Sequence, residues 1–184
     1  LEETPEQQLL CDQFVHGVEK EDGSLERLEF HNEDKFNFAF DIVDGLARRE
    51  PDKLAMVHVA NDMTERRFTF KDMKDASSQA ANYFTSLGVK RGDRVMLVLK
   101  RHYQFWFAIL GLHKLGAIAI PATNQLMEHD FSYRFQAAGV SAIVCTADGD
   151  TAHQVDIAEA DAGVHLTKVL VGGKREGWHD FDAE

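Results

Sequence analysis

Residues 110–125 constrain the fold of this chain more than any other segment. They are typical of the end of a buried helix, a glycine hinge at Gly116, a short apolar strand at residues 117–120 and a polar loop opened by Pro121. That order is half of a βαβ unit, in which a helix connects two parallel strands. We therefore expect a parallel sheet with a candidate ligand loop attached to it.

Helical and strand-like segments alternate through the following residues. An apolar run over residues 94–99 is typical of a strand covered on both faces, and residues 102–115 carry apolar side chains around most of a helix. Further helices are expected at residues 130–138 and 151–162, and further strands at residues 141–146 and 166–171. The alternation predicts the α/β class, with a mostly parallel sheet flanked by helices.

The first residues predict a different kind of region. Residues 4–7 combine a capping threonine, a proline and a glutamine, and they predict a helix that continues to about Gly17. Residues 19–29 are polar and acidic, as in a surface arm or linker. We therefore expect an amino-terminal arm with a short helix at residues 1–34, followed by an incomplete α/β subdomain at residues 35–184.

Two local elements are expected before the alternating region. Phe36, Phe40, Val43 and Leu46 or Ala47 form an apolar stripe at helical spacing, so a helix with this face toward a core should stop before Pro51. Residues 54–60 and 67–70 are typical of two strands, and the turn-rich segment between them predicts a hairpin.

A second capping pattern predicts the next helix. Thr69 and Asp72 have the spacing of a capping box, and Gly88 is suited to the helix end. On the later helix at residues 102–115, Trp106 and Phe107 are candidates for an acyl-chain pocket, but aromatic side chains on a helix between two strands are usually core residues. We interpret both as packing residues.

Charge and composition exclude several classes of protein. A formal net charge of −11 argues against nucleic acid as a partner, because such binding needs clustered Lys and Arg. No apolar run approaches the roughly 20 residues of a membrane span. The first residues do not have the pattern of a secretory signal. The start at Leu1, without Met, suggests a trimmed or partial chain. Cys11 and Cys145 form no CxxC pair, and we predict a reduced, cytoplasmic protein.

The sequence offers no strong pattern for metal or triphosphate binding. The nine histidines are scattered and show no HExxH spacing, so we expect no metal site. A triphosphate needs a Ser/Thr/Gly-rich loop with a lysine, because backbone amides and a cation must offset its charge. Gly172, Gly173 and Lys174 lack flanking Ser and Thr, and we interpret them as a surface turn. No catalytic residue is therefore assigned.

Ligands of parallel α/β sheets bind beyond the carboxyl ends of the strands. This rule places residues 100–101, 121–127 and 146–150 along one edge as candidate contacts. Arg101 is one possible anion ligand, but an arginine at the end of a strand is more often a solvated charge, and we leave it out of the site.

Several stretches occur together in the order seen in acyl-CoA synthetases. They are residues 36–44, Gly92-Asp93-Arg94-Val95, residues 115–125, Tyr133-Arg134 and Ala142-Ile143-Val144. Over residues 35–184 the chain resembles the medium-chain acyl-CoA synthetases of the adenylate-forming, or AMP-binding, superfamily. The resemblance implies part of the amino-terminal large domain of such an enzyme, about the first third of its length.

The resemblance also implies an activity for the complete enzyme. Such enzymes use ATP and magnesium to join a carboxylic acid, here expected to be a fatty acid, to coenzyme A through an acyl-adenylate. Gln125 matches a glutamine that contacts coenzyme A in the medium-chain enzymes, and its amide suits the pantetheine arm or a phosphate. The family's phosphate loop, ribose-binding aspartate and catalytic lysine are absent, so we expect these 184 residues alone to bind no ATP and to be inactive.

Three alternatives stay open at this point. The chain could be a stand-alone α/β ligand-binding or interaction module, for which the fold alone says little about the ligand. It could instead be part of an aryl-CoA ligase or of an amino-acid-activating adenylation domain, which share the region around Pro121. For Gln125 itself, the alternative to a coenzyme A contact is an ordinary loop glutamine bonded to nearby backbone.

Overall fold

The computed structural model describes residues 9–184 and divides into two compact units, Leu1–Lys74 and Asp75–Glu184. The capping pattern expected at residues 4–7 lies outside the described residues. Each unit is therefore described by itself.

The first described residues form a hairpin rather than a long helix. A single 3-10 turn, η1 (Leu10–Gln13), precedes β1 (Val15–Glu19), which pairs antiparallel with β2 (Leu25–Phe30). The predicted continuation of a helix to Gly17 is therefore wrong. The reason is the turn at Gly23, where φ is +79° and the Lys20 carbonyl oxygen accepts a 2.9 Å hydrogen bond from the Gly23 amide, which reverses the chain.

The predicted helix before Pro51 exists, and part of its predicted apolar face is buried. It consists of a π-helical turn, η2 (Ala39–Val43), followed by α1 (Asp44–Arg49). Ala39, Val43 and Ala47 are buried, whereas Phe36 and Phe40 are 40% and 45% exposed. Val43 and Ala47 are buried as predicted. Phe36 is not, because it precedes the helix, and Phe40 is not, because the wider π turn shifts its side chain relative to ideal α-helical spacing.

The hairpin and capping predictions that follow are confirmed. β3 (Leu54–Val59) pairs antiparallel with β4 (Glu65–Thr69), and α2 (Phe70–Ser86) begins at once. The Thr69 backbone amide donates to the Asp72 carboxylate at 2.8 Å, and the Asp72 amide donates to the Thr69 hydroxyl at 3.1 Å. This reciprocal pair satisfies two amides at the helix start.

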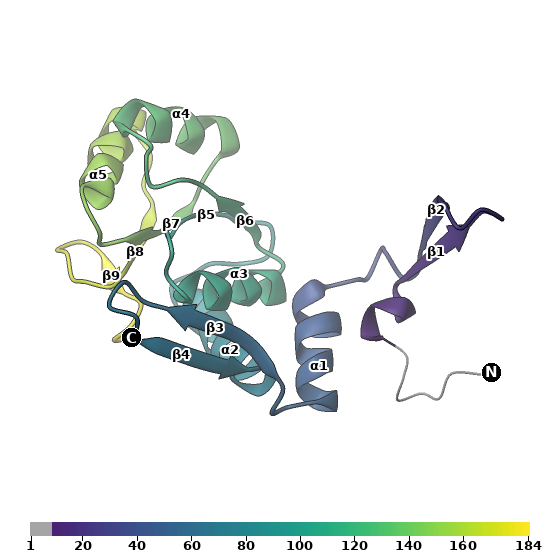
Figure 1. The fold of residues 1–184 in the computed structure, drawn as a ribbon. Coiled ribbons are helices and arrows are strands. Elements are labelled where there is room, and N and C mark those ends of the chain that lie inside the picture. Colours follow the sequence, from purple (N-terminus) through teal and green to yellow (C-terminus); the bar gives the residue numbers. More distant parts are fainter. Residues whose placement is uncertain (1–8) are drawn as a thin grey trace. The chain divides into compact units, whose positions relative to one another are not determined.

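The second unit contains a parallel sheet. Its strands are β5 (Arg94–Val98), β6 (Ile118–Pro121), β7 (Ala142–Thr146), β8 (Thr167–Val171) and β9 (His179–Asp180). They lie in the order β6-β5-β7-β8-β9 (Figure 1), and every neighbouring pair is parallel. The predicted α/β class is confirmed. The two-residue strand β9 was not predicted.

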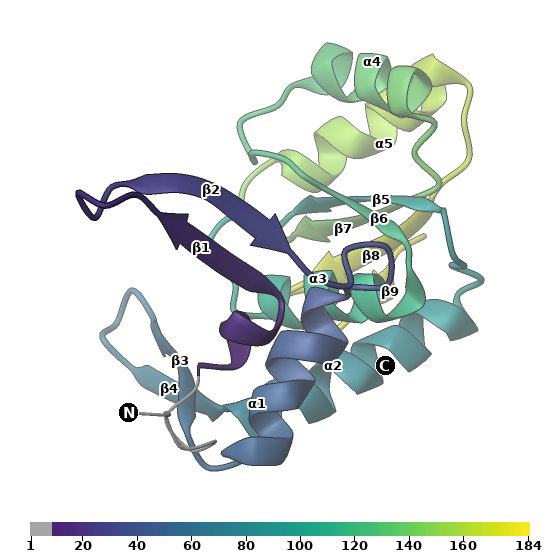
Figure 2. The ribbon, with the colours of Figure 1, turned by 90° about the vertical axis from the view of Figure 1, so that its right-hand side faces the viewer.

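Helices cover both faces of this sheet. They are α3 (Gln104–Leu115), α4 (Glu128–Ala138) and α5 (Thr151–Ala162), together with α2. Figure 2 shows the sheet between α4 and α5 on one side and α2 and α3 on the other. The strand alternation explains the two layers, because successive side chains point to opposite faces. Val95 and Leu97 pack in the α2/α3 core, and Met96 and Val98 pack in the α4/α5 core.

Gly111 determines how closely α2 and α3 pack. A Cβ at this position would lie 2.9 Å from the Cβ of Ala80, so only glycine fits without movement.

The expectation that Trp106 is a core residue is wrong, because its side chain is 50% exposed. A helix on the outside of a sheet buries one side completely, as at Ala108 and Leu112, and the apolar residues of its other side stay accessible in this chain.

One ionic network stabilises the outer side of β8. The Asp156 carboxylate on α5 accepts hydrogen bonds from Lys168 at 2.8 Å, from Arg175 at 2.7 Å and from the Trp178 indole at 3.0 Å. Lys168 also donates to Glu159 at 2.6 Å. Burial by itself raises the pKa of Asp156, but the hydrogen bonds from Lys168, Arg175 and Trp178 outweigh burial and lower that pKa.

Candidate functional site

The strand order creates a crevice at the carboxyl edge of the sheet. β5 and β7 are neighbours, but β5 leads into α3 on one face and β7 leads into α5 on the other. Loops that leave adjacent strands for opposite faces diverge, and ligands of open α/β sheets bind in the crevice between them. The loop after β6, which carries Gln125, ends at the same edge.

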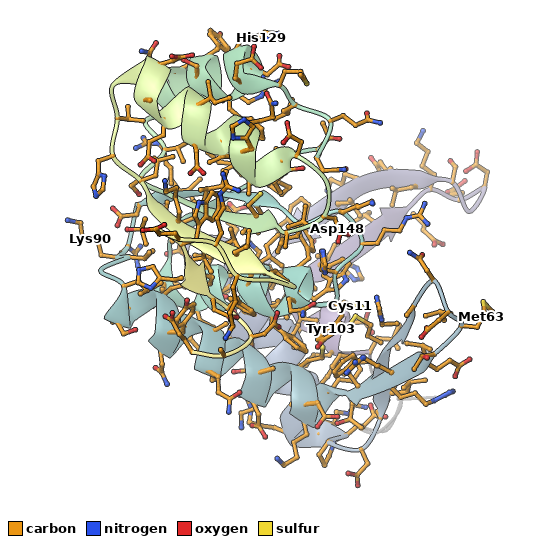
Figure 3. All side chains as sticks on the ribbon, turned by 90° about the vertical axis from the view of Figure 1, so that its left-hand side faces the viewer. Cys11, Met63, Lys90, Tyr103, His129 and Asp148 are labelled. Atoms are coloured by element: carbon orange, nitrogen blue, oxygen red, sulfur yellow. The ribbon has the colours of Figure 1, made fainter. Side chains whose placement is uncertain are left out.

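Polar side chains from the ends of β5 and β7 meet here. The His102 Nε2 atom lies 2.7 Å from the Thr146 hydroxyl oxygen and 3.8 Å from the Asp148 carboxylate. The Lys100 ammonium lies 3.9 Å from the same carboxylate. Lys100 has a φ of +27°, a left-handed conformation that costs a non-glycine residue energy and that often marks functional sites. Figure 3 shows Asp148 and Lys90, which precedes β5, at opposite ends of the sheet.

A pocket of about 280 Å³ lies at this edge. Three segments line it: Lys100 after β5, the loop after β6, and the start of α5. Its lining residues are Lys100, Asn124, Gln125, Leu126, Met127, Asp148, Gly149, Asp150, Thr151 and Gln154. The three loop regions expected at the edge are therefore brought together in space.

The charge balance of the pocket favours an uncharged polar ligand group. One ammonium, from Lys100, faces two carboxylates, from Asp148 and Asp150. Three amide side chains, Asn124, Gln125 and Gln154, supply both hydrogen-bond donors and acceptors. A phosphate in this pocket would meet repulsion from the two carboxylates, whereas an amide or hydroxyl would not.

Gln125 lies on an exposed part of a loop that is held at several points. The Ala122 amide donates to the Leu97 carbonyl oxygen at 2.9 Å, which continues the β5–β6 ladder. The Gln125 backbone amide donates to the Thr123 hydroxyl at 3.3 Å. Within residues 9–184, its side-chain amide makes no hydrogen bond, so both its donor and its acceptor are available to a ligand.

Other predicted positions lie differently. Arg101 is exposed and does not line the pocket, whereas Lys100 does. The turn at Gly172 and Gly173 follows β8, and a Cβ at Gly173 would lie 2.7 Å from the Cβ of Ala147. These glycines therefore allow close approach of neighbouring loops, consistent with the expected surface turn.

Two pocket residues, Thr151 and Gln154, lie outside the ranges that the sequence predicted, and Gln154 lies furthest from them. Gln154 lies in the first turn of α5, four residues after Asp150, beyond the loop to which the rule for carboxyl ends applies. The spacing of four residues after the carboxyl-edge loop was the available signal, since residues four apart share a helix face.

A larger hollow of about 620 Å³ lies away from this edge, between α2 and residues 181–184. It contains Tyr83, whose pKa is raised by burial and by the nearby Glu184 carboxylate, which accepts a 3.3 Å hydrogen bond from the Tyr83 hydroxyl. We assign the site to the smaller pocket, because it lies at the carboxyl ends of β5, β6 and β7.

Residues 9–184 contain neither a metal-binding cluster nor a membrane-spanning helix. Among these residues, no group of three or more His, Cys, Asp or Glu side chains is arranged to hold a metal ion. No helix in the described part of the chain is long and apolar enough to cross a membrane.

The fold and the edge pocket define an α/β ligand-binding scaffold, and comparison with known proteins identifies the family. The chain matches the AMP-binding enzyme family over residues 43–181, more than half of its length, and it belongs to that family. It is 35% identical to the mitochondrial acyl-coenzyme A synthetase ACSM2 of Rattus norvegicus over 157 residues, and 37% identical to mitochondrial ACSM5 of the same species over 153 residues. The expected resemblance to medium-chain acyl-CoA synthetases is confirmed.

Solved structures agree with this assignment. The crystal structure of the Brucella canis acyl-CoA synthetase superposes with a TM-score of 0.68 at 25% identity and covers 80% of this chain. The chain spans only about a quarter of its relatives, namely 27% of ACSM2, 26% of ACSM5 and 27% of the Brucella protein.

The prediction of a cytoplasmic protein is wrong. Three similar acyl-coenzyme A synthetases, two from rat and one from human, are named as mitochondrial. The two unpaired cysteines, Cys11 and Cys145, fit any reducing compartment, and they do not distinguish the cytosol from other such compartments.

Proposed function

We propose that this chain is part of an ATP-dependent acyl-CoA synthetase and forms one wall of its coenzyme A site. In the complete enzyme, a carboxylate oxygen of the acid attacks the α-phosphorus of ATP, and pyrophosphate leaves. The coenzyme A thiol then loses its proton and attacks the acyl carbon of the adenylate, and AMP leaves. Membership of the AMP-binding enzyme family, together with the acyl-coenzyme A synthetase relatives, carries this proposal.

The acid is proposed to be a fatty acid, because the relatives are named acyl-coenzyme A synthetases and one similar solved structure is a fatty acyl CoA synthetase of Mycobacterium tuberculosis. ATP and magnesium are proposed to be held by other parts of the complete enzyme. Residues 9–184 present no cluster suited to a metal ion, and the turn at Gly172 and Gly173 lacks the Ser and Thr residues of a phosphate loop. The names of the relatives also support a mitochondrial location.

Gln125 is proposed to contact the pantetheine arm of coenzyme A. The arm carries two amides and a hydroxyl and no charge. The pocket suits these groups, because its amide side chains can pair with them and its two carboxylates disfavour phosphate. The unengaged side-chain amide of Gln125 supports the same assignment.

Replacement of Gln125 by alanine in a full-length ligase that contains this chain tests the proposal. Loss of one or two neutral hydrogen bonds should raise the KM for coenzyme A about 3- to 10-fold. ATP/pyrophosphate exchange should be unchanged, because adenylate formation precedes thiol binding. Gln136→Ala, an exposed glutamine near the far end of α4, is the matched control and should change neither value.

Pantetheine as the thiol acceptor identifies the part of coenzyme A that is recognised. If Gln125 contacts the arm, Gln125→Ala should raise the KM for pantetheine and the KM for coenzyme A by the same factor. A loss seen only with coenzyme A would assign Gln125 to the nucleotide phosphates instead. Equal losses in pyrophosphate exchange and thioester formation would contradict the proposed role.

A further inference from the structure

The loop that carries Gln125 leads into α4, whose start lacks a capping side chain of its own. The residue before the helix is Met127, and a thioether is too weak an acceptor to satisfy backbone amides. Each helix start leaves four backbone amides without intrahelical partners, so another group must accept from them. Asp130 accepts from the Met127 amide at 3.2 Å.

The acceptor for the next amide, that of Glu128, lies on a different helix. The Glu128 amide donates to the Gln154 side-chain oxygen on α5 at 3.0 Å. The Gln154 side-chain nitrogen donates in turn to the Asp150 carboxylate at 2.7 Å. Both ends of the Gln154 amide are therefore used, and the half-buried side chain is fixed between the starts of α4 and α5.

A second residue of α5 holds the same loop from the other side of Gln125. The hydroxyl of Thr151, which is 4% exposed, lies 3.5 Å from the Asn124 carbonyl oxygen. The first turn of α5 thus contacts the backbone on both sides of Gln125, at Asn124 and at Glu128. Gln154 and Gln125 also line the same pocket.

We infer that Gln154 is a positioning residue for coenzyme A binding, which caps α4 from α5 and so fixes the loop that presents Gln125. This inference rests on the proposed role of Gln125. The pocket is built from loops that diverge at the sheet edge. A contact between α5 and the loop that carries Gln125 therefore holds that loop at a fixed distance from α5. Pre-positioning of the loop reduces the ordering cost of binding.

The test uses Gln154→Ala in the full-length ligase. We expect hydrogen–deuterium exchange at residues 124–128 to become faster, because the Glu128 amide loses its acceptor and the loop its anchor. The KM for coenzyme A should rise roughly 3- to 10-fold, as for loss of one or two hydrogen bonds, with kcat for pyrophosphate exchange unchanged.

Gln136→Ala is a closely matched control. Gln136 also bridges the same two helices, since its side chain donates to the Ala162 carbonyl oxygen at 3.1 Å, but it lies at their other ends. A general loosening of the α4/α5 pair should appear in both variants. A KM effect confined to Gln154→Ala supports positioning of the pocket, and an equal KM effect in both variants overturns it.

A double substitution at residues 154 and 150 tests whether the bridge can be restored. In Gln154→Glu, an oxygen still accepts from Glu128, but the new carboxylate faces Asp150, so the bridge should fail. Adding Asp150→Asn restores a donor opposite the carboxylate, and the double variant should recover most of the exchange protection and of the KM. Failure of the double variant to recover either value overturns the inference.

The two proposals fail in distinguishable ways. If Gln125→Ala leaves the KM for coenzyme A unchanged, the proposed role of Gln125 is wrong. If Gln125→Ala has its expected effect but Gln154→Ala changes neither the exchange at residues 124–128 nor the KM, the positioning inference alone is wrong.

Discussion

Replacement of Gly111 by alanine tests how closely α2 and α3 pack. An added Cβ would lie 2.9 Å from the Cβ of Ala80, 3.0 Å from the backbone nitrogen of Ala81 and 3.1 Å from the carbonyl oxygen of Ser77. Two of these three atoms are backbone, so the helices must move apart, because no flexible side chain can turn away. Overpacking of this kind costs about 1–3 kcal/mol.

The gain in helix propensity offsets part of that cost. Alanine is favoured over glycine in a helix interior by about 1 kcal/mol. We therefore expect Gly111→Ala to lower the free energy of unfolding by about 1 kcal/mol, within a range of about 0–2 kcal/mol. Urea unfolding followed by circular dichroism measures this value, and the midpoint should fall with an unchanged slope.

Two further variants separate packing from propensity. At Gly45 on α1, the nearest contact of an added Cβ is the flexible end of Leu10, at 2.9 Å, so Gly45→Ala should be neutral or stabilising. Ala80→Gly removes the closest atom, so combining it with Gly111→Ala should destabilise less than the sum of the single changes. A stabilising Gly111→Ala would refute the close-packing argument.

Two other predictions concern ionisable groups. Because the folded-state pKa of Asp156 is lowered from 3.8, its stabilisation is present above that value and is lost as pH falls through the folded pKa. Asp156→Asn should therefore lower the free energy of unfolding by about 1–2 kcal/mol at neutral pH. In urea titrations, the difference in this free energy between the parent and the variant should shrink below about pH 4. A difference that stays constant with pH would contradict this prediction. Burial raises the pKa of Cys145 to about 12, so a thiol reagent at pH 8 should label Cys11 alone until the chain unfolds; rapid labelling of both cysteines would show that Cys145 is accessible.

Long periodic segments made most of the second unit predictable from sequence. The apolar run at β5, the helix α5 and the capping box at Thr69 depend on interactions between residues that are close in sequence, so a local pattern suffices. Predicted residues 151–162 match the observed bounds of α5. The parallel arrangement also followed from alternation, because short loops leave few other ways to connect these elements.

The errors occurred where local patterns were ambiguous. Leu10, Phe14 and Val18 lie at helical spacing, but the Asp22-Gly23 pair is a hairpin signal, and the strand pairing it permits took precedence over the helix. Trp106 was wrongly placed in the core, because a helix with apolar residues all round does not reveal which of them a neighbour covers.

The candidate site was predictable in outline but not in detail. The rule for carboxyl ends placed the correct loops together around Gln125. It gave no sign of Gln154, whose contact with Glu128 joins residues 26 positions apart. The four-residue spacing from Asp150 indicates only a shared helix face, and the hydrogen bond between the two helix starts depends on the packed structure.

The edge strands of the five-stranded sheet affect the tendency of the protein to self-associate at high concentration. One outer strand, β6, has four residues and ends in Pro121, which has no amide hydrogen to donate, and the other, β9, has only two residues. Strands this short and interrupted are poor templates for another molecule's backbone. These edges therefore disfavour self-association through added strands, although the core of the α/β unit is rich in valine, which favours aggregation once exposed.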